Sequence, residues 1–236
     1  MPLAAWVLAG VALCTTLGGC AREEAADTTP ESAAPAAARA EQSAVRYTIR
    51  QQIHANLPEL AFTLVGDRPA AADDTVGIAR IEIREAAATE PLQVIAGLDA
   101  QPPLVDGRPA AEILDMNFDG YGDFRLVQSR SAGPNTPYLN WLFDPARRAF
   151  VESRELNEIP SARFDADHRE IRSDWRDGAN RYGTDIYVFQ DGRPILVRKE
   201  EKTYQAPGVY RLKKSRLVDG TWKTVEEKEV REPKGG

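Results

Sequence analysis

The sequence predicts an all-β body built of antiparallel hairpins, and three observations support this fold class. Short runs alternate between apolar and polar residues, with the period of two that is typical of half-buried strands. In the second half of the chain, turn signals recur at spacings of roughly 20–30 residues, which matches one β-hairpin per interval. A hydrophobic content of 42% and a charged content of 28% fit a globular core. Both a propeller-like arrangement and a sandwich fit these observations.

Residues 1–19 are predicted to be a removable signal peptide. An apolar stretch over residues 2–17 precedes Gly18, Gly19 and Cys20, and it is shorter than the roughly 20 residues that a membrane-spanning helix needs. The arrangement resembles a bacterial lipoprotein signal, which implies cleavage before Cys20 and attachment of lipid to this residue. The same resemblance implies a periplasmic protein anchored in the outer membrane, since Ala rather than Asp follows the cysteine. An ordinary secretory peptide or a buried N-terminal helix is the alternative.

Residues 20–45 are predicted to be a disordered tether that carries the lipidated cysteine. Ala, Glu, Pro, Thr and Ser dominate the stretch over residues 21–44, which holds no aromatic residue and can therefore bury little apolar surface. An alanine-rich helix is the alternative, but Pro30 and Pro35 interrupt it. The all-β domain is expected over residues 46–236.

The charge and the cysteine content exclude some functions. The net charge of −6 argues against nucleic acid as a partner, because phosphates require clustered Lys and Arg. It suits a basic protein partner or a divalent cation. Cys14, the other cysteine, lies in the predicted signal peptide. The domain is therefore expected to be stabilised by core burial and metal rather than by a disulfide.

Short strands are predicted in the first half of the domain. Residues 61–65 form an apolar run that ends at a Gly-Asp turn, and Tyr47 is a candidate start of a preceding strand in an ambiguous stretch. Residues 76–84 alternate with a shift of one near Arg80, which predicts a β-bulge. Residues 92–95 form another apolar run that is predicted to be a strand.

In the second half, an aromatic residue repeatedly precedes an Asp-led turn. The pattern occurs at Phe118-Asp119, Phe143-Asp144, Phe164-Asp165 and Phe189-Gln190-Asp191, and Asp219-Gly220 extends it. Asp and Gly supply the local hydrogen bonds and positive φ angles that turns require. The later turns are predicted to join antiparallel strands, with 141–143 pairing 150–151 and 187–189 pairing 195–197.

Residues 115–123 carry the strongest chemical motif. Oxygen-bearing side chains occupy positions 1, 3, 5 and 9 of this segment, and Gly120 occupies position 6. Calcium prefers 6–8 oxygen ligands at about 2.3–2.6 Å, and ligands at every second residue before a glycine-permitted reversal wrap around one point. We predict a calcium loop between two strands, since Leu126 stands where an EF-hand has its closing Glu. A metal-free hairpin turn is the alternative. The predicted ligands are four side chains and the backbone carbonyl of a tyrosine: Asp115, Asn117, Asp119, Tyr121 and Asp123.

Residues suited to catalysis are scarce. The two histidines, His54 and His168, lie far apart in sequence, which does not favour a zinc cluster or a Ser-His-Asp triad. Carboxylates are numerous, but no pair stands out as the acid and base of a glycosidase. The protein is therefore not expected to be an enzyme.

Residues 113–197 resemble a known family. The string ILDMNFDGYGDF, then Tyr138, and the later strings NWLFDP and AFVES are similar to periplasmic lysozyme-inhibitor lipoproteins. Members of that family include immunity proteins against lysozyme-like effectors of bacterium-killing type IV secretion systems. The first string alone is also similar to integrin-type calcium repeats. The resemblance implies an all-β, calcium-binding protein that blocks a glycan-cleaving enzyme by filling its active-site cleft.

The same resemblance implies that residues 131–138 form the partner-binding loop. Ser131, Gly133 and Tyr138 resemble the Ser-x-Gly…Tyr element of related inhibitors, although the tyrosine is spaced further away here. Ser and Tyr hydroxyls can donate hydrogen bonds to the catalytic carboxylates of a lysozyme, and two prolines limit the entropy that the loop loses on capture. A surface loop with a strand-end tyrosine is the alternative.

These observations lead to the expectation of a calcium-binding periplasmic lipoprotein that inhibits a lysozyme-like glycan hydrolase, as an immunity protein does. The alternative is a calcium-stabilised structural or interaction module of the cell envelope that has no enzyme target.

Overall fold

The computed structural model describes residues 44–67, 74–131 and 133–232. The predicted signal peptide, Cys20 and nearly all of the predicted tether lie outside the described residues. The described chain is almost entirely β-strand, with one short helix, so the predicted all-β class is confirmed. No helix in this described part is long and apolar enough to cross a membrane.

The first sheet is an antiparallel meander of four strands in the order of the chain. Its strands are β1 (Val45–Gln51), β2 (Leu60–Gly66), β3 (Ile78–Glu85) and β4 (Gln93–Ala100). The predicted bulge near Arg80 is confirmed, because the register of β3 shifts between Ile78 and Arg80 against β4. On the other side of β3, Gly66 of β2 lies so close to Gly77 that a Cβ on Gly66 would lie 1.8 Å from the Gly77 carbonyl oxygen. Only glycine fits at that position.

The second sheet has the order β10-β9-β8-β7 and is also antiparallel. Its strands are β7 (Ala111–Leu114), β8 (Asp123–Val127), β9 (Tyr138–Asp144) and β10 (Ala149–Glu152). The predicted pairing of 141–143 with 150–151 is confirmed, with Phe150 opposite Phe143. A two-stranded hairpin of β5 (Leu104–Val105) and β6 (Arg108–Pro109) precedes this sheet.

The third sheet is a six-stranded antiparallel meander. Its strands are β11 (Ala162–Asp165), β12 (Glu170–Asp177), β13 (Arg181–Gln190), β14 (Arg193–Ala206), β15 (Val209–Val218) and β16 (Thr221–Arg231). The turns predicted after Phe164, after Phe189 and at Asp219 all join neighbouring strands of this sheet. The short helix α2 (Arg154–Asn157) was not predicted; the Ser153 side chain caps it by accepting from the Leu156 amide.

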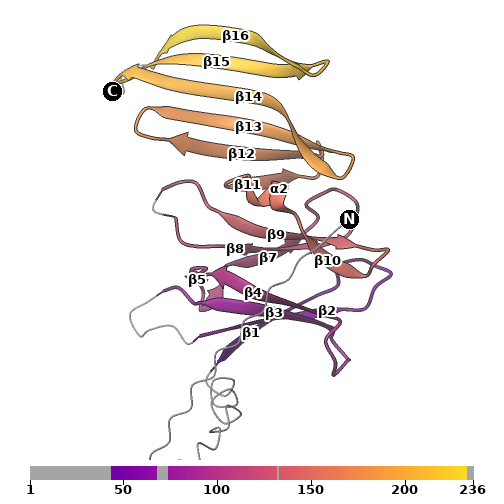
Figure 1. The fold of residues 1–236 in the computed structure, drawn as a ribbon. Helices are drawn as coiled ribbons and strands as arrows, with labels where there is room; N and C mark the ends of the chain where they lie inside the picture. Colours follow the sequence, from indigo (N-terminus) through magenta and orange to yellow (C-terminus); the bar gives the residue numbers. More distant parts are fainter. Residues whose placement is uncertain (1–43, 68–73, 132, 233–236) are drawn as a thin grey trace, which may run out of the picture.

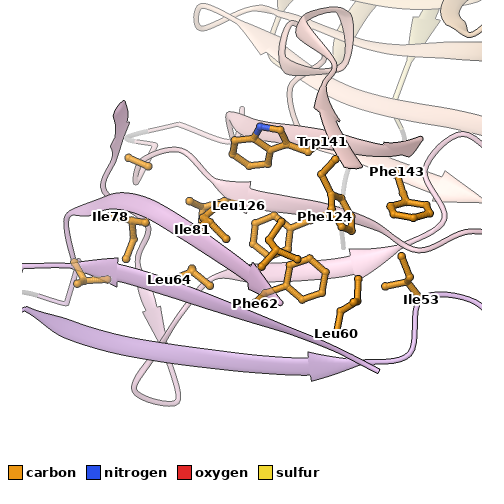
Figure 2. Close-up of a cluster of buried hydrophobic side chains, with 14 residues drawn as sticks. Ile53, Leu60, Phe62, Leu64, Ile78, Ile81, Phe124, Leu126, Trp141 and Phe143 are labelled. Atoms are coloured by element: carbon orange, nitrogen blue, oxygen red, sulfur yellow. The ribbon is translucent and has the colours of Figure 1, made fainter. Parts of the chain in front are cut away.

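The first two sheets pack face to face and enclose the main core. Phe62 of β2 lies parallel to Phe124 of β8 with ring centroids 5.2 Å apart, and Phe150 of β10 meets Phe62 edge-on. Figure 2 shows Phe62 and Phe124 converging between the two sheets, with Ile81 and Leu126 beside them. Each such buried apolar side chain stabilises the fold by about 1.5–3 kcal/mol. The body is therefore sandwich-like, which decides between the two architectures that the sequence left open.

A second core connects the sandwich to the third sheet. It contains Met116 and Phe118 from the candidate calcium loop, Leu156 from α2, and Ile171 from β12. These side chains come from three separate parts of the chain, so the position of the third sheet depends on the conformation of the loop over residues 115–123.

The outer strands of the third sheet form a single layer. Figure 1 shows β15 and β16 at the far end of the third sheet, away from the sandwich, with no helix or second sheet lying against them. Of the described residues in β15 and β16, only Leu212 and Ser215 are buried. Both faces of this part of the sheet are therefore open to solvent.

Candidate calcium loop and partner-binding loop

The candidate calcium loop connects β7 to β8, whose residues Leu114 and Asp123 are paired. Its side chains alternate between two directions: Met116 and Phe118 are buried in the second core, whereas Asp119 is exposed. The apolar positions therefore hold the loop against the protein, and Asp115, Asn117 and Asp119 lie on its less buried side.

Hydrogen bonds gather the acidic side chains around one backbone turn. The carboxylate of Asp115 accepts from the amides of Asp119 at 3.0 Å and Gly120 at 2.9 Å. The Asn117 side-chain oxygen accepts from the same Asp119 amide at 3.2 Å, so oxygens of both residues converge there. Asp119 in turn accepts from the Tyr121 amide at 2.9 Å. The reversal needs a φ of +93° at Gly120, which glycine adopts without strain.

Asp123 lies at the closed end of the loop and is fully buried. One of its carboxylate oxygens accepts from the Met116 amide and the other from the Phe143 amide, both at 2.8 Å. Burial, together with the smaller effect of the charges of Asp119 and Asp115, raises the pKa of Asp123 to about 7 against the opposing effect of these two amides. The carboxylate therefore joins the loop to β9, and a nearby cation would favour its charged form.

The residues of this loop fit calcium by ligand type, since all are hard oxygen donors. Asp115, Asn117 and Asp119 already share hydrogen-bond partners on the outer side of the turn. Each Asp123 oxygen accepts one amide and keeps a further lone pair. In the described part of the chain, no three His, Cys, Asp or Glu side chains form a closed metal cluster. A calcium ion here would therefore also need the Asn117 oxygen, the Tyr121 carbonyl and water.

The candidate partner-binding loop follows β8, and its residues 131 and 133–138 are described. The Ser131 hydroxyl accepts from the Gly133 amide at 3.1 Å, which forms a tight turn. The Asn135 side chain accepts from the Arg176 amide and donates to the Arg176 carbonyl, both at 2.9 Å. Asn135 thus pairs with the backbone of β12 as a neighbouring strand would.

Ser161 holds the same loop from a second side. Its hydroxyl donates to the Pro134 carbonyl at 2.8 Å and accepts from the Thr136 amide at 2.9 Å. Its own amide donates to the Thr136 carbonyl at 2.8 Å. The loop is therefore fastened to the third sheet over residues 134–136, while Ser131 and Gly133 precede this fastened part.

Tyr138 lies at the start of β9 and not at the tip of the loop. It is half-buried opposite Val127, and the Arg125 guanidinium lies 4.3 Å from the centre of its ring. Tyr138 is thus the strand-end tyrosine of the alternative interpretation, because pairing with β8 extends through this residue. Of the three predicted partner-binding residues, Ser131 and Gly133 share one turn, and Tyr138 is separate from them.

The sequence analysis did not identify Arg125, whose guanidinium packs against the Tyr138 ring. Arg125 is buried, donates to the Glu112 carboxylate at 2.6 Å and to the Ala162 carbonyl at 2.7 Å, and so links the second and third sheets. One signal was available in the sequence: a single charge inside the apolar run over residues 124–127. Such a charge is retained in a core only where it is paired.

Comparison with known proteins supports the architecture. No family model matches the chain, and no curated protein matches it. A solved structure described as a Xanthomonas type IV secretion system related protein aligns with a TM-score of 0.56 and 17% sequence identity, over 77% of this chain and 99% of that one. At this level of identity the likeness concerns the fold, and this chain therefore shares its fold with that Xanthomonas protein.

Proposed function

We propose that this protein is a lipid-anchored periplasmic inhibitor of a peptidoglycan-cleaving, lysozyme-like enzyme, with the role of an immunity protein. The observation that carries the proposal is that the Asn135 and Ser161 contacts fasten residues 134–136 of the candidate loop to the third sheet. A loop that is ordered before binding loses less entropy when a partner captures it. The shared fold with a type IV secretion related protein supports a place in the cell envelope.

The lipid anchor is a separate part of the proposal and rests on the segment before Cys20. Cys20→Ser is expected to abolish lipid attachment, because the thiol is the group that the lipid would modify. Metabolic labelling with a tagged fatty acid measures this directly. Label on the variant equal to that on the parent would show that the lipid is attached to another residue.

Calcium would be held by the oxygens of Asp115, Asn117 and Asp119, the Tyr121 carbonyl and the inner carboxylate of Asp123. Its charge would offset the repulsion among these carboxylates and stabilise the loop as folded. Because Met116 and Phe118 of the same loop belong to the second core, the ion would also brace the third sheet against the sandwich.

Inhibition would follow from hydrogen bonds to the enzyme's catalytic carboxylates, of which lysozyme-like enzymes use two. The Tyr138 hydroxyl and the Ser131 hydroxyl are the donors in this proposal. Tyr138 is suited to the task because its ring packs on Arg125 and its backbone is paired with β8, so its hydroxyl is carried by a strand. Placement on a strand is more precise than placement at a loop tip.

Two variants of Tyr138 test the proposal. Tyr138→Ala removes the ring and the hydroxyl and is expected to weaken inhibition by about 2 kcal/mol, or roughly thirtyfold in the inhibition constant. Tyr138→Phe keeps the ring on Arg125 and removes only the hydroxyl, so it should retain the stability of the parent and still lose roughly tenfold in inhibition. The measurement is the clearance of turbid cell-wall suspensions by purified muramidases, including any encoded beside this protein, titrated with each variant.

A Tyr138→Phe variant that inhibits as well as the parent would remove the hydroxyl from the proposed mechanism. If the parent inhibits no muramidase, the second candidate applies, which is a calcium-stabilised interaction module of the envelope without an enzyme target. The open single-layer part of the third sheet (Figure 1) favours this second candidate, because it offers a wide surface to a partner.

A further inference from the structure

One face of the third sheet carries an excess of positive charge. Residues that pair directly across antiparallel strands lie on the same face, and three cross-strand rows of this sheet can be followed from β12 to β16. We define the basic face by the charged residues of these rows. It comprises eight cations and three acids: Arg172, Arg176, Arg198, Lys202, Lys214, Arg216, Lys223 and Lys228, with Asp174, Glu200 and Glu226.

The first of these rows places like charges side by side. In the first row Arg198 lies directly between Ile186 and Arg216, and Arg216 lies directly opposite Lys223. Like charges that face each other across strands are destabilising. Arg172 pairs with Asp174 at 2.8 Å and Arg198 pairs with Glu170, but no carboxylate lies within 4.0 Å of the Arg216 guanidinium among the described residues. The basic face therefore contains charge that internal ion pairs leave unneutralised.

The basic face is continuous with the proposed inhibitory loop. Pro134 lines a hollow of about 440 Å³ together with Arg172, Tyr182 and Lys202. The neighbouring residue Asn135 pairs with the backbone of β12. A partner that covers Pro134 and Asn135 therefore also contacts the nearest part of the basic face.

Tyrosines stand at the end of the basic face that lies beyond this hollow. Tyr204 contacts Tyr182 and Tyr210 with ring centroids 5.7 Å and 5.1 Å apart, and the Arg176 guanidinium lies 5.1 Å from the Tyr182 ring. Tyrosine and arginine are enriched at the centres of protein interfaces. These rings are partly exposed on an uncovered sheet, which suits contact with another protein.

We infer that the basic face is the second half of the contact with the inhibited enzyme, and that it docks on an acidic surface beside the enzyme's cleft. The inference rests on the proposed function. The net charge of −6 by itself suggests a basic partner, but the charge next to the docking loop, not the net charge, governs local complementarity and steering. A cleft that already contains catalytic carboxylates is an acidic neighbour for such a face.

The test compares two charge reversals on the same strand. Arg216 and Lys213 are both exposed on β15, and their odd spacing places them on opposite faces, with Lys213 opposite Glu201 and Glu227. The probe is the muramidase that the parent inhibits, and its association rate with each immobilised variant is measured at several salt concentrations. Arg216→Glu should slow association by roughly fivefold at low salt, whereas Lys213→Glu should leave it within roughly twofold of the parent. The difference should vanish near 1 M salt, where the screening length is about 3 Å.

The outcomes separate this inference from the proposed function. If the parent inhibits the enzyme but the two variants associate at equal rates, the basic face is not part of the contact, and the inhibitor proposal stands. Faster association of Arg216→Glu than of the parent would show a basic partner surface and would also overturn the inference. If the parent inhibits no muramidase, both proposals fail together. Thermal unfolding of both variants checks that neither reversal has altered the fold.

Discussion

Asp123→Ala is expected to lower the free energy of unfolding by about 3–5 kcal/mol, because it leaves two buried amides, those of Met116 and Phe143, without an acceptor. Asp123→Asn keeps one acceptor oxygen but places its side-chain NH2 group against the other backbone N–H. The free energy of unfolding is therefore expected to fall by about 2 kcal/mol. Urea unfolding of both variants in the presence of a chelator measures the effect apart from any metal.

Asp144 provides a matched control for this measurement. Its carboxylate also accepts from two backbone amides, those of Ala146 and Arg147, at 2.9 and 3.1 Å. These bonds lie in an exposed turn, where water can replace the lost acceptor. Asp144→Ala should therefore lose less than about 1 kcal/mol. An Asp123→Ala variant that is as stable as Asp144→Ala would show that Asp123 does not hold the loop to β9.

Removing calcium is expected to lower the free energy of unfolding by about 2.7 kcal/mol, relative to the protein with calcium at a hundredfold excess over its Kd. The predicted ligands lie on the loop whose Met116 and Phe118 form the second core. The loss should therefore appear first at the junction with the third sheet. Thermal unfolding with calcium and with chelator measures the free energy, and amide hydrogen exchange locates it. Exchange should accelerate in β11–β13 and remain unchanged in β2 and β3, which belong to the main core.

Two substitutions sharpen the calcium experiment. Asp119→Ala should remove most of the calcium-dependent stabilisation, because it deletes a charged side chain at the outer side of the loop. Asp191→Asn removes the same charge from the turn between β13 and β14, where the residue has a φ of +51° that Asn tolerates, and it should keep the full calcium effect. Coincident melts of the parent protein with calcium and with chelator would contradict the prediction, and the loop would then depend on its hydrogen bonds alone.

The strands and turns were largely predictable, because the signals that specify them are local. Alternation of side chains indicates a strand wherever one face is buried, and the bulge at Arg80 was visible as a slip in that alternation. The turns after Phe143, Phe164 and Phe189 were visible because Asp and Gly carry the backbone requirements of a turn within a few residues. The short helix after Ser153 escaped prediction because a single turn has no periodicity to detect.

The roles of individual site residues were less predictable. The spacing of residues 115–123 indicates oxygen ligands, but the burial of Asp123 depends on Phe143, twenty residues further on. Tyr138 looked like a loop residue because nothing in its immediate sequence indicates that Val127 lies opposite it. The guanidinium of Arg125 is held against Tyr138 by hydrogen bonds to Glu112 and Ala162, which are distant in the sequence.

By itself, then, the sequence determined the all-β class, the hairpin turns, the bulge and the oxygen-rich loop, since each depends on residues that are close together along the chain. The tertiary structure alone decided that two sheets form a sandwich, that Asn135 is fastened to β12, and that Arg198, Arg216 and Lys223 lie in one row. The alternation of apolar and polar residues specifies which residues of a strand share a face, but it does not specify which other strand pairs with that strand. That choice is made by pairing and packing between distant segments, and the charge of a surface is the sum of those choices.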